Sequence, residues 1–463
     1  MIDESSKENI LDIIKHQHHF FKGGATRNLG FRMEALKILK QIILDNEKEI
    51  ADALWKDLHK SYEEAYLTEI SIVLQEIDLH LKQLQNWVKP KRVKTPLHLL
   101  PSRSEIRFEP LGVALIIAPW NYPFQLLMNP LVGAMSAGCC SVLKASPNAP
   151  HTAALVKRLV KEVLNDPYIV LFEGGREVNE LLLQQRFDII FFTGSPAVGK
   201  VVMKAAAEHL TPVVLELGGK SPCIVEKGAN IDLAAKRIAW GKTINAGQTC
   251  IAPDYLFVHH SIKKELLKKI GENFVAMHGN DAQQSPYYPR IVSPEAMVRL
   301  QKLMDHGRVV FGGKVDMADK YIEPTIIDEV KPFHPIMQEE IFGPILPVMT
   351  FDNLGEAINH LRQHEDPLAV YYFGEDKGFE NGADCILNET RSGGVCINDT
   401  LMHIANHHLP FGGVGNSGMG KYHGYNSFLA FSYSRAVVNS PTWIDLPFKY
   451  PPFKYFKLIR KYI

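Results

Sequence analysis

The chain has 463 residues, and its 51 Lys and Arg residues balance 51 Asp and Glu residues, so the formal net charge at pH 7 is zero. This length favours two or three domains, and 46% hydrophobic with 22% charged residues is typical of a folded globular protein. A neutral chain without a basic, aromatic-rich stripe argues against nucleic-acid binding.

The cysteine spacing and the start of the chain bear on location. None of the six cysteines forms a C-x-x-C pair, so we expect reduced thiols and a cytoplasmic protein. The acidic, polar N-terminus has no leader pattern. Residues 110–143 contain no charged side chain, but four prolines divide them into pieces too short for a bilayer, which predicts a buried core.

Helices come first along the chain. Apolar residues recur at helical spacing in the first hundred residues, for example Ala35, Ile38, Leu39 and Ile42, and these helices should cover the outside of a domain. From Gly112 onward, short apolar strands alternate with helices near 150–164 and 197–209. The expected strands are 113–118, 141–145, 169–172, 188–192 and 213–217. This alternation predicts a parallel, doubly wound sheet, whose ligands bind at the carboxyl ends of the strands.

A second α/β region follows. Its predicted elements are helices at 232–244 and 262–275 and strands at 255–259, near 321–328, at 369–373 and at 394–397. Two segments fit neither region: the basic, proline-rich residues 88–108 and the tail after about residue 430. Such excursions are typical of arms that pair with another subunit.

Residues 190–200 form the first chemical motif. An apolar strand ends at Gly194, Ser195 can cap the next helix, and Pro196 suits its first turn. The free amides at such a helix start suit a pyrophosphate, although an ordinary strand-to-helix turn would look the same. Residues 413–418 match G-x-G-x-x-G, but no strand precedes them and no acidic residue follows about 20 positions on, so we interpret them as a loop.

Three further residues are candidate catalytic groups. Glu216 ends an apolar strand before two glycines, where it could be a desolvated general base or the partner of a lysine. Cys250 follows Gly247 on the loop after helix 232–244, where it could be a nucleophile or a small buried side chain. Asn121, between two prolines, could donate to an oxyanion or only form a turn.

Together these motifs resemble one known family. Residues 118–123, 190–200, 215–220, 245–250, 338–344 and 409–413 are similar to motifs of the aldehyde dehydrogenase superfamily, and the similarity runs from about residue 20 to 435. Residues 249–255 and 410–424 resemble its class 3 branch, which includes the fatty aldehyde dehydrogenases. The resemblance implies an α/β fold with two doubly wound domains and a small oligomerisation arm. The implied cofactor-binding domain is 1–85 and 107–214, the catalytic domain is 215–425, and the arm and tail are 86–106 and 426–463.

The resemblance also implies the chemistry. It predicts an oxidoreductase that oxidises aldehydes to carboxylic acids, with Cys250 as the nucleophile that forms a thioester, Asn121 and the Cys250 amide as oxyanion donors, and Glu216 as activator of the hydrolytic water. A glutamate at position 216 argues against relatives that pass the acyl group to coenzyme A. The substrate pocket is expected to include Tyr122 and Thr249. The residues expected to bind the dinucleotide are Trp120, Lys144, Ser146, Gly194, Ser195, Gly199, Glu340 and Phe342.

Pro147 departs from the family pattern. Many relatives carry an acidic residue three positions after the strand-end lysine, here Lys144, where it binds the adenosine ribose. Proline neither accepts those hydrogen bonds nor repels a 2′-phosphate, so we predict that both NAD and NADP are accepted. No motif supplies an arginine for a substrate carboxylate, which favours apolar aliphatic or aromatic aldehydes. The histidines at 16–19 and 403–408 lack other ligands at tight spacing, so no metal is expected.

Two competing hypotheses remain open, together with the role of the tail. The chain could be an acyl-transferring or aldehyde-reducing member of the same fold, or a binding protein that has lost activity. In the tail, one helical face contains the apolar residues Tyr455, Leu458, Ile459, Tyr462 and Ile463, with lysines opposite. We expect a homodimer, and this face could pack on its own subunit or on the partner. It could also make weak peripheral contact with the inner membrane surface.

Overall fold

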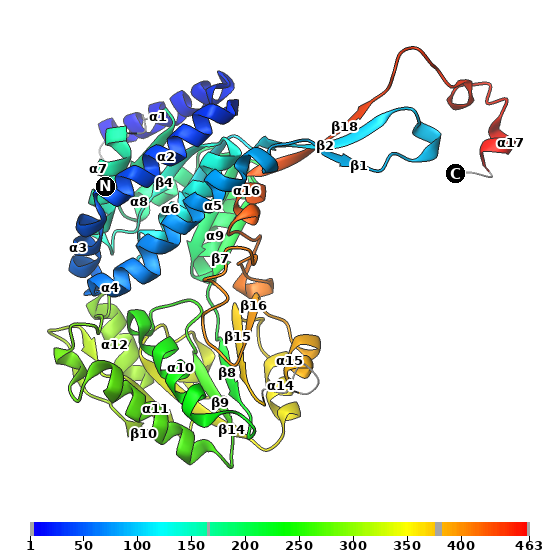
Figure 1. Ribbon diagram of the computed structural model, residues 1–463. Helices are drawn as coiled ribbons and strands as arrows, with labels where there is room; N and C mark the ends of the chain where they lie inside the picture. Colours follow the sequence, from blue (N-terminus) through cyan, green and yellow to red (C-terminus); the bar gives the residue numbers. More distant parts are fainter. Residues whose placement is uncertain (1–3, 164–166, 376–381, 461–463) are drawn as a thin grey trace.

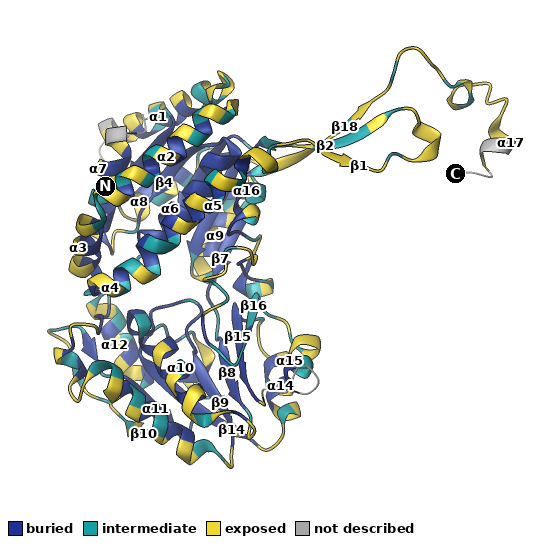
Figure 2. Ribbon diagram, viewed as in Figure 1, coloured by how far each residue is buried: buried dark blue, intermediate teal, exposed yellow. Residues whose placement is uncertain are grey.

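The computed structural model describes residues 4–163, 167–375 and 382–460. The chain forms two α/β bodies, and a thin arm extends from the first body and carries the C-terminal tail away from both (Figure 1). Burial is concentrated in the two sheets, whereas the arm is mostly exposed (Figure 2).

The first body contains a six-stranded sheet in the order β17-β7-β6-β3-β4-β5, parallel except for β17. The chain runs from β3 outward through β4 and β5, then crosses to the other side for β6 and β7. The carboxyl ends of β3 and β6 therefore flank the point where the strand order reverses, which is where such sheets bind ligands. The strands are β3 (Val113–Ile117), β4 (Cys140–Lys144), β5 (Ile169–Phe172), β6 (Ile189–Gly194), β7 (Val213–Leu217) and β17 (Gly418–Met419).

Helices cover this sheet, which explains why β3 and β4 are buried along their whole length and read as apolar runs. Helix α6 packs against β3 and β4 with α2 and α5 outside it, and α9 packs against β6 and β7. The helices of this body are α1 (Glu4–Lys22), α2 (Leu29–Asp45), α3 (Glu47–Leu58), α4 (Tyr62–Ala65), α5 (Ser71–Trp87), α6 (Gln125–Ala137), α7 (Pro150–Val163), α8 (Arg176–Leu183), α9 (Pro196–Ala207) and α16 (Tyr425–Ala430).

The second body contains a seven-stranded sheet in the order β10-β13-β14-β9-β8-β15-β16, parallel except for β10. Its strands are β8 (Pro222–Val225), β9 (Tyr255–His259), β10 (Arg308–Phe311), β13 (Thr325–Asp328), β14 (Ile345–Phe351), β15 (Ala369–Phe373) and β16 (Gly394–Ile397). A small hairpin joins β11 (Val315–Asp316) to β12 (Tyr321–Ile322). The helices are α10 (Ile231–Thr243), α11 (Lys263–His278), α12 (Pro294–Leu303), α13 (Pro335–Gln338), α14 (Leu354–Arg362) and α15 (Gly382–Glu389).

The arm is an antiparallel sheet of β1 (Lys91–Val93), β2 (Arg103–Pro110) and β18 (Ser432–Asn439). These strands lie in segments that were expected to be arms but not strands, because their alternating charged side chains give no apolar strand pattern. The tail beyond them contains α17 (Phe456–Ile459). Of the apolar face predicted there, Tyr455 is exposed, whereas the side chains of Leu458 and Ile459 and all of Tyr462 and Ile463 lie outside the description.

Sheet membership divides the chain at slightly different points from the expected domains. Strand β7 belongs wholly to the first sheet and β8 opens the second, whereas the expected boundary at residue 215 falls inside β7. Helix α16 packs on α6 of the first body, although it was expected within the arm and tail. In the described ranges no helix is long and apolar enough to cross a bilayer, and α6, in the uncharged stretch, has only 13 residues, all buried.

Candidate active site

Cys250 lies on a loop whose backbone is unusual. Helix α10 ends at Thr243, and Asn245, Ala246 and Gly247 then all have positive φ, near 50°, 50° and 72°. The left-handed stretch thus begins two residues before the glycine expected to end the helix. A Cβ on Gly247 would lie 2.3 Å from the carbonyl oxygen of Gly343, so only glycine fits there. Strain of this kind is typical of segments that present a functional side chain.

The Cys250 thiol is partly exposed to a small cavity. Desolvation by the surrounding protein, and then the nearby carboxyl groups of Glu340 and Glu216, raise the pKa of this thiol well above its usual range. The thiol is therefore protonated in the free protein at neutral pH. A neighbouring base is needed to make it a nucleophile.

Asn121 lies beside this loop, just beyond the carboxyl end of β3. Its Nδ2 donates to the carbonyl oxygen of Gln248 at 3.0 Å, and the second hydrogen of the amide has no partner among the described residues. Asn245 donates from its own Nδ2 to the carbonyl oxygens of Asn121, at 2.8 Å, and Gln248, at 3.0 Å. The loops of the two bodies are thus joined within two residues of Cys250.

Glu216 is the next-to-last residue of β7 and is 3% exposed. Burial raises the pKa of this carboxyl group to about 8, and the charge of Lys421 opposes the shift. Neither carboxyl oxygen has a hydrogen-bond partner in the part of the chain that the structure describes. The segment that matches G-x-G-x-x-G returns to the first sheet here, because Gly418 of β17 pairs with Glu216. A desolvated carboxyl group near neutrality is suited to general base catalysis.

The cavity next to Cys250 has a volume of about 180 Å³. Tyr122 and Thr249, both predicted for the substrate pocket, line it and share a hydrogen bond of 2.6 Å between their hydroxyl groups. None of the described side chains that line the cavity is charged. Besides Cys250, Tyr122 and Thr249, the lining residues are Leu67, Thr68, Ile72, Gln125, Leu126, Trp240, Ile244, Ile251, Leu401, Met402, Ile404, Ala405 and Phe411.

The residues expected to bind adenosine and phosphate lie at the carboxyl ends of β4 and β6. Lys144 is buried and donates to the carbonyl oxygens of Ala145, at 2.6 Å, and Gly174, at 2.7 Å. Burial lowers the pKa of Lys144 to about 8. Ser146 lies two residues beyond this strand end. This part of the sheet therefore offers an ammonium group and a hydroxyl group next to the strand-order reversal.

The turn from β6 into α9 completes that end of the site. Ser195 caps α9, with its Oγ accepting from the Val198 amide at 3.4 Å. A Cβ on Gly194 would lie 2.5 Å from the Phe192 ring, and one on Gly199 would lie 2.8 Å from Leu217. The glycines therefore allow α9 to pack closely on the sheet with its N-terminus at the strand ends. A helix start, hydroxyl groups and a buried lysine together fit a dinucleotide phosphate.

Glu340, Phe342 and Trp120 lie nearer to the cysteine. The Phe342 backbone has φ near 50°, and its ring packs edge-on against Trp120 with 5.4 Å between centroids. Burial raises the pKa of the Glu340 carboxyl group to about 8. One Glu340 oxygen would be 2.0 Å from a Cβ on Gly218, so the carboxyl group lies directly against the chain between β7 and β8. Both bodies therefore contribute to the space in front of Cys250.

Three lysines near these residues were not anticipated. Lys242 is buried in α10, its Nζ has no hydrogen-bond partner among the described residues, and burial lowers its pKa to about 8. Lys60 donates to the main-chain carbonyl oxygen of Asn121, and Lys421 lies near Glu216. Their partners are distant in sequence, so no local signal identifies them. Among the described residues, no group of three His, Cys, Asp or Glu side chains could hold a metal ion.

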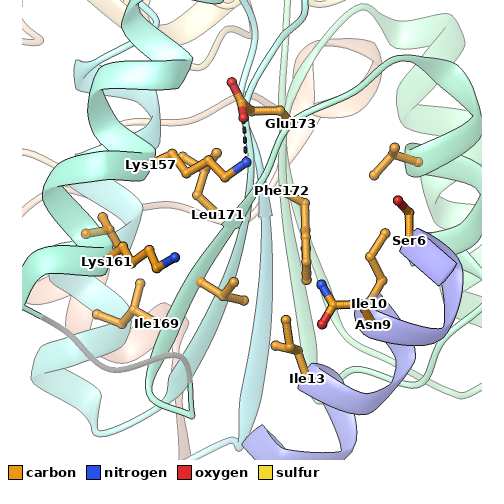
Figure 3. Close-up of a pocket in the computed structure, with 13 residues that line it drawn as sticks. Ser6, Asn9, Ile10, Ile13, Lys157, Lys161, Ile169, Leu171, Phe172 and Glu173 are labelled. Atoms are coloured by element: carbon orange, nitrogen blue, oxygen red, sulfur yellow. Dashed lines mark hydrogen bonds and ion pairs between the residues drawn. The ribbon is translucent and has the colours of Figure 1, made fainter. Parts of the chain in front are cut away.

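A separate hollow of about 490 Å³ lies between α1, α7 and β5 (Figure 3). It contains apolar side chains such as Ile13 and Phe172 and an ion pair of 2.6 Å between Lys157 and Glu173. None of the predicted site residues lines it. This hollow is therefore separate from the predicted site.

Known proteins match the chain over nearly its whole length. The aldehyde dehydrogenase family matches residues 1–437. Over 446 residues the chain is 47% identical to 4,4'-diaponeurosporen-aldehyde dehydrogenase of Staphylococcus aureus, covering 96% of each chain. It is 44% identical to the dimeric NADP-preferring aldehyde dehydrogenase of Rattus norvegicus, covering 93% of this chain and 94% of that one. The structure of the substrate-bound state of Staphylococcus aureus AldH has a TM-score of 0.96 at 46% identity, covering 98% of this chain and 99% of that chain.

These similarities confirm the predicted fold, the family and its class 3 branch. The order of strands in both sheets and the antiparallel arm agree with that fold. The chain belongs to the aldehyde dehydrogenase family, and it is an NAD(P)+-dependent oxidoreductase that converts aldehydes to carboxylic acids.

Proposed function

We propose that this enzyme oxidises apolar aliphatic or aromatic aldehydes and that Cys250, Asn121 and Glu216 carry the reaction. The observation that supports this most is the uncharged cavity that ends at the Cys250 thiol. Transfer of an alkyl or aryl group from water into such a cavity is favourable. A carboxylate or phosphate would lose its hydration there without a cation to pair with.

In the first step the Cys250 thiol loses its proton to the nearby carboxylate of Glu340, and the sulfur adds to the aldehyde carbon. The carbonyl oxygen becomes an oxyanion, which the free hydrogen of Asn121 Nδ2 and the Cys250 amide stabilise. NAD(P)+ supplies the hydride acceptor when it is bound. Loss of hydride from the former aldehyde carbon leaves a thioester on Cys250.

In the second step Glu216 removes a proton from water, which attacks the thioester carbon. The carbon–sulfur bond breaks, the carboxylic acid leaves, and the thiol is regenerated. The raised pKa of Glu216 supports this role. A carboxyl group whose pKa lies near neutral pH binds a proton strongly, and part of it is still ionised and able to accept one. Thioester formation and hydrolysis thus depend on different side chains.

We propose that the adenosine and phosphate end of the cofactor is held by Lys144, Ser146, Ser195 and the start of α9. Gly194 and Gly199 allow this helix to pack closely on the sheet. The side chains of Glu340, Phe342 and Trp120 would orient the nicotinamide end towards Cys250. Pro147 leaves no acidic side chain at the position discussed above, which supports use of both NAD and NADP.

The catalytic assignment is tested by single-turnover kinetics. Cys250→Ala should abolish oxidation, whereas Glu216→Gln should form one equivalent of reduced cofactor rapidly and then turn over slowly. Cys385→Ala is a matched control, because Cys385 is a partly exposed thiol on α15 away from the cavity. A Cys250→Ala enzyme with near-normal turnover would show that another residue is the nucleophile.

The substrate class is tested with straight-chain aldehydes of increasing length and a carboxylated aldehyde of matched size. Each added methylene should raise kcat/KM by about fourfold until the cavity is full, from roughly 0.8 kcal/mol per buried methylene. The carboxylated aldehyde should be poor. Equal kcat/KM for the charged and apolar aldehydes would contradict the apolar assignment.

The exposed arm and tail support two further parts of the proposal. Leu97, Val438 and Trp443 are exposed apolar side chains on them, which suits contact with a second copy in a homodimer. The aromatic residues Tyr455 and Phe456 are exposed as well, which suits salt-sensitive contact with a membrane surface. Sedimentation with anionic vesicles should pellet the full chain more than a chain ending at Pro452. Equal pelleting of the two would remove the membrane role.

A further inference from the structure

Lys60 and Glu69 form an ion pair in the interior of the first body. Their side chains are both 0% exposed, and Lys60 Nζ lies 2.5 Å from Glu69 Oε1. Lys60 follows α3, and Glu69 lies in the π-helix Tyr66–Ile70. A π-helix is rare, and it is frequently found at functional sites. A buried ion pair usually adds little net stability, so a role other than stabilising the fold has to be considered for Lys60 and Glu69.

Both members of the pair hold the segment that contains Asn121. Lys60 Nζ donates to the main-chain carbonyl oxygen of Asn121 at 3.0 Å and lies 3.9 Å from the centroid of the Tyr122 ring. Glu69 Oε2 accepts from the amides of Phe124, at 2.9 Å, and Gln125, at 3.1 Å. The segment is therefore held on both sides of Pro123.

The contact with the Asn121 carbonyl oxygen is specific. That oxygen also accepts from Asn245 Nδ2 at 2.8 Å, so Lys60 and Asn245 use both of its lone pairs. Two donors on one carbonyl oxygen define the peptide plane that follows Asn121. The plane limits where the Asn121 side chain leaves the main chain, and the hydrogen bond from its Nδ2 to the Gln248 carbonyl oxygen then orients the amide. The direction of the remaining hydrogen is then determined as well.

We propose that Lys60 is a positioning residue of the oxyanion site, which acts through the main chain of Asn121, with Glu69 holding the Lys60 ammonium group in place. This inference rests on the proposed role of Asn121 as an oxyanion donor. It assigns a kinetic function to a charged pair that touches neither the aldehyde nor the cofactor.

The test is a double-mutant cycle on kcat and KM for a good aldehyde substrate. Removing an oxyanion donor costs on the order of 100-fold in rate, so Lys60→Met, which misdirects that donor, should lower kcat by roughly 10-fold to 100-fold. KM should change less than kcat, because Lys60 does not itself line the cavity and touches it only through the ring of Tyr122. In an Asn121→Ala background the same substitution should lower kcat by less than about threefold, because the group through which Lys60 acts is gone.

Lys60→Met leaves Glu69 buried without its cation, which could prevent folding. The double variant Lys60→Met/Glu69→Gln removes both charges and should fold, as judged by circular dichroism, and should show the same loss of kcat. A matched control is Lys263→Met/Asp328→Asn, which removes a 2.9 Å ion pair between α11 and β13. Its kcat should be unchanged.

The outcomes separate this inference from the proposed function. An equal loss of kcat from Lys60→Met with and without Asn121 would overturn it, and so would a folded double variant with the kcat of the wild type. If Asn121→Ala itself leaves kcat unchanged, the proposed role of Asn121 is wrong and the inference falls with it.

Discussion

Glu216→Gln should make the protein more stable at neutral pH while it slows turnover. In the folded protein burial raises the pKa of this carboxyl group from 4.5 to about 8. Because the folded pKa is above the unfolded value, folding takes up a proton when the pH lies between about 4.5 and about 8. The wild type therefore carries a penalty that is absent below pH 4.5, grows with pH, and levels off above about 8.

The size of the penalty follows from the same two values. Each pH unit above the unfolded pKa costs about 1.4 kcal/mol, so the penalty reaches about 3 kcal/mol at pH 7. A glutamine has the same shape and carries no charge. Its amide replaces oxygens that already lack partners in the described structure, so it adds little further cost.

Urea unfolding of the wild type and Glu216→Gln from pH 5 to pH 8.5 measures this effect. The two midpoints should nearly coincide at pH 5 and should separate progressively, with the variant more stable, as the pH rises. Glu208→Gln, on the exposed end of α9, should show no such trend. A difference that is independent of pH, or a variant that is less stable at pH 8, would refute the reasoning.

Three other substitutions test neighbouring features. Lys421→Met should move the pH midpoint of thioester hydrolysis upward, because the charge of Lys421 lowers the pKa of Glu216; an unchanged profile would contradict this. Pro147→Glu should raise the ratio of kcat/KM for NAD to that for NADP, and no wild-type activity with saturating NADP would contradict dual use. Gly247→Ala should reduce activity severely, because φ is near 72° and a Cβ would lie 2.3 Å from the Gly343 carbonyl oxygen; normal turnover would show that the loop can rearrange.

Local sequence was sufficient for much of the first body. The strands around 113–118, 141–145 and 169–172 were predicted within a residue or two, because strands buried on both faces are short apolar runs. Ser195 was predicted as a helix cap for the same kind of reason, since capping depends on three or four consecutive residues. The position of Cys250 on a loop after α10 was also a local property.

Other strands were not predicted, with or without a local signal. Strand β14 is apolar along its buried length but was not predicted, and β2 and β18 are charged strands that pair with each other outside both bodies. The return of Gly418 to pair with Glu216 joins positions about 200 residues apart. Pairing of this kind depends on backbone groups, which every residue has, so side-chain patterns do not reveal it.

The character of the site arises where distant segments meet. The family resemblance indicated that one site contains Glu216, Cys250 and Asn121. The raised pKa of Glu216 was not predictable in this way, because it comes from burial by segments far along the chain. The uncharged cavity is assembled from residues between Leu67 and Phe411. Lys60 reaches Asn121 across 61 positions. Periodicity and motifs describe neighbours in the chain, whereas desolvation and hydrogen-bond geometry depend on neighbours in space, and these exist only once the two sheets and their helices have packed together.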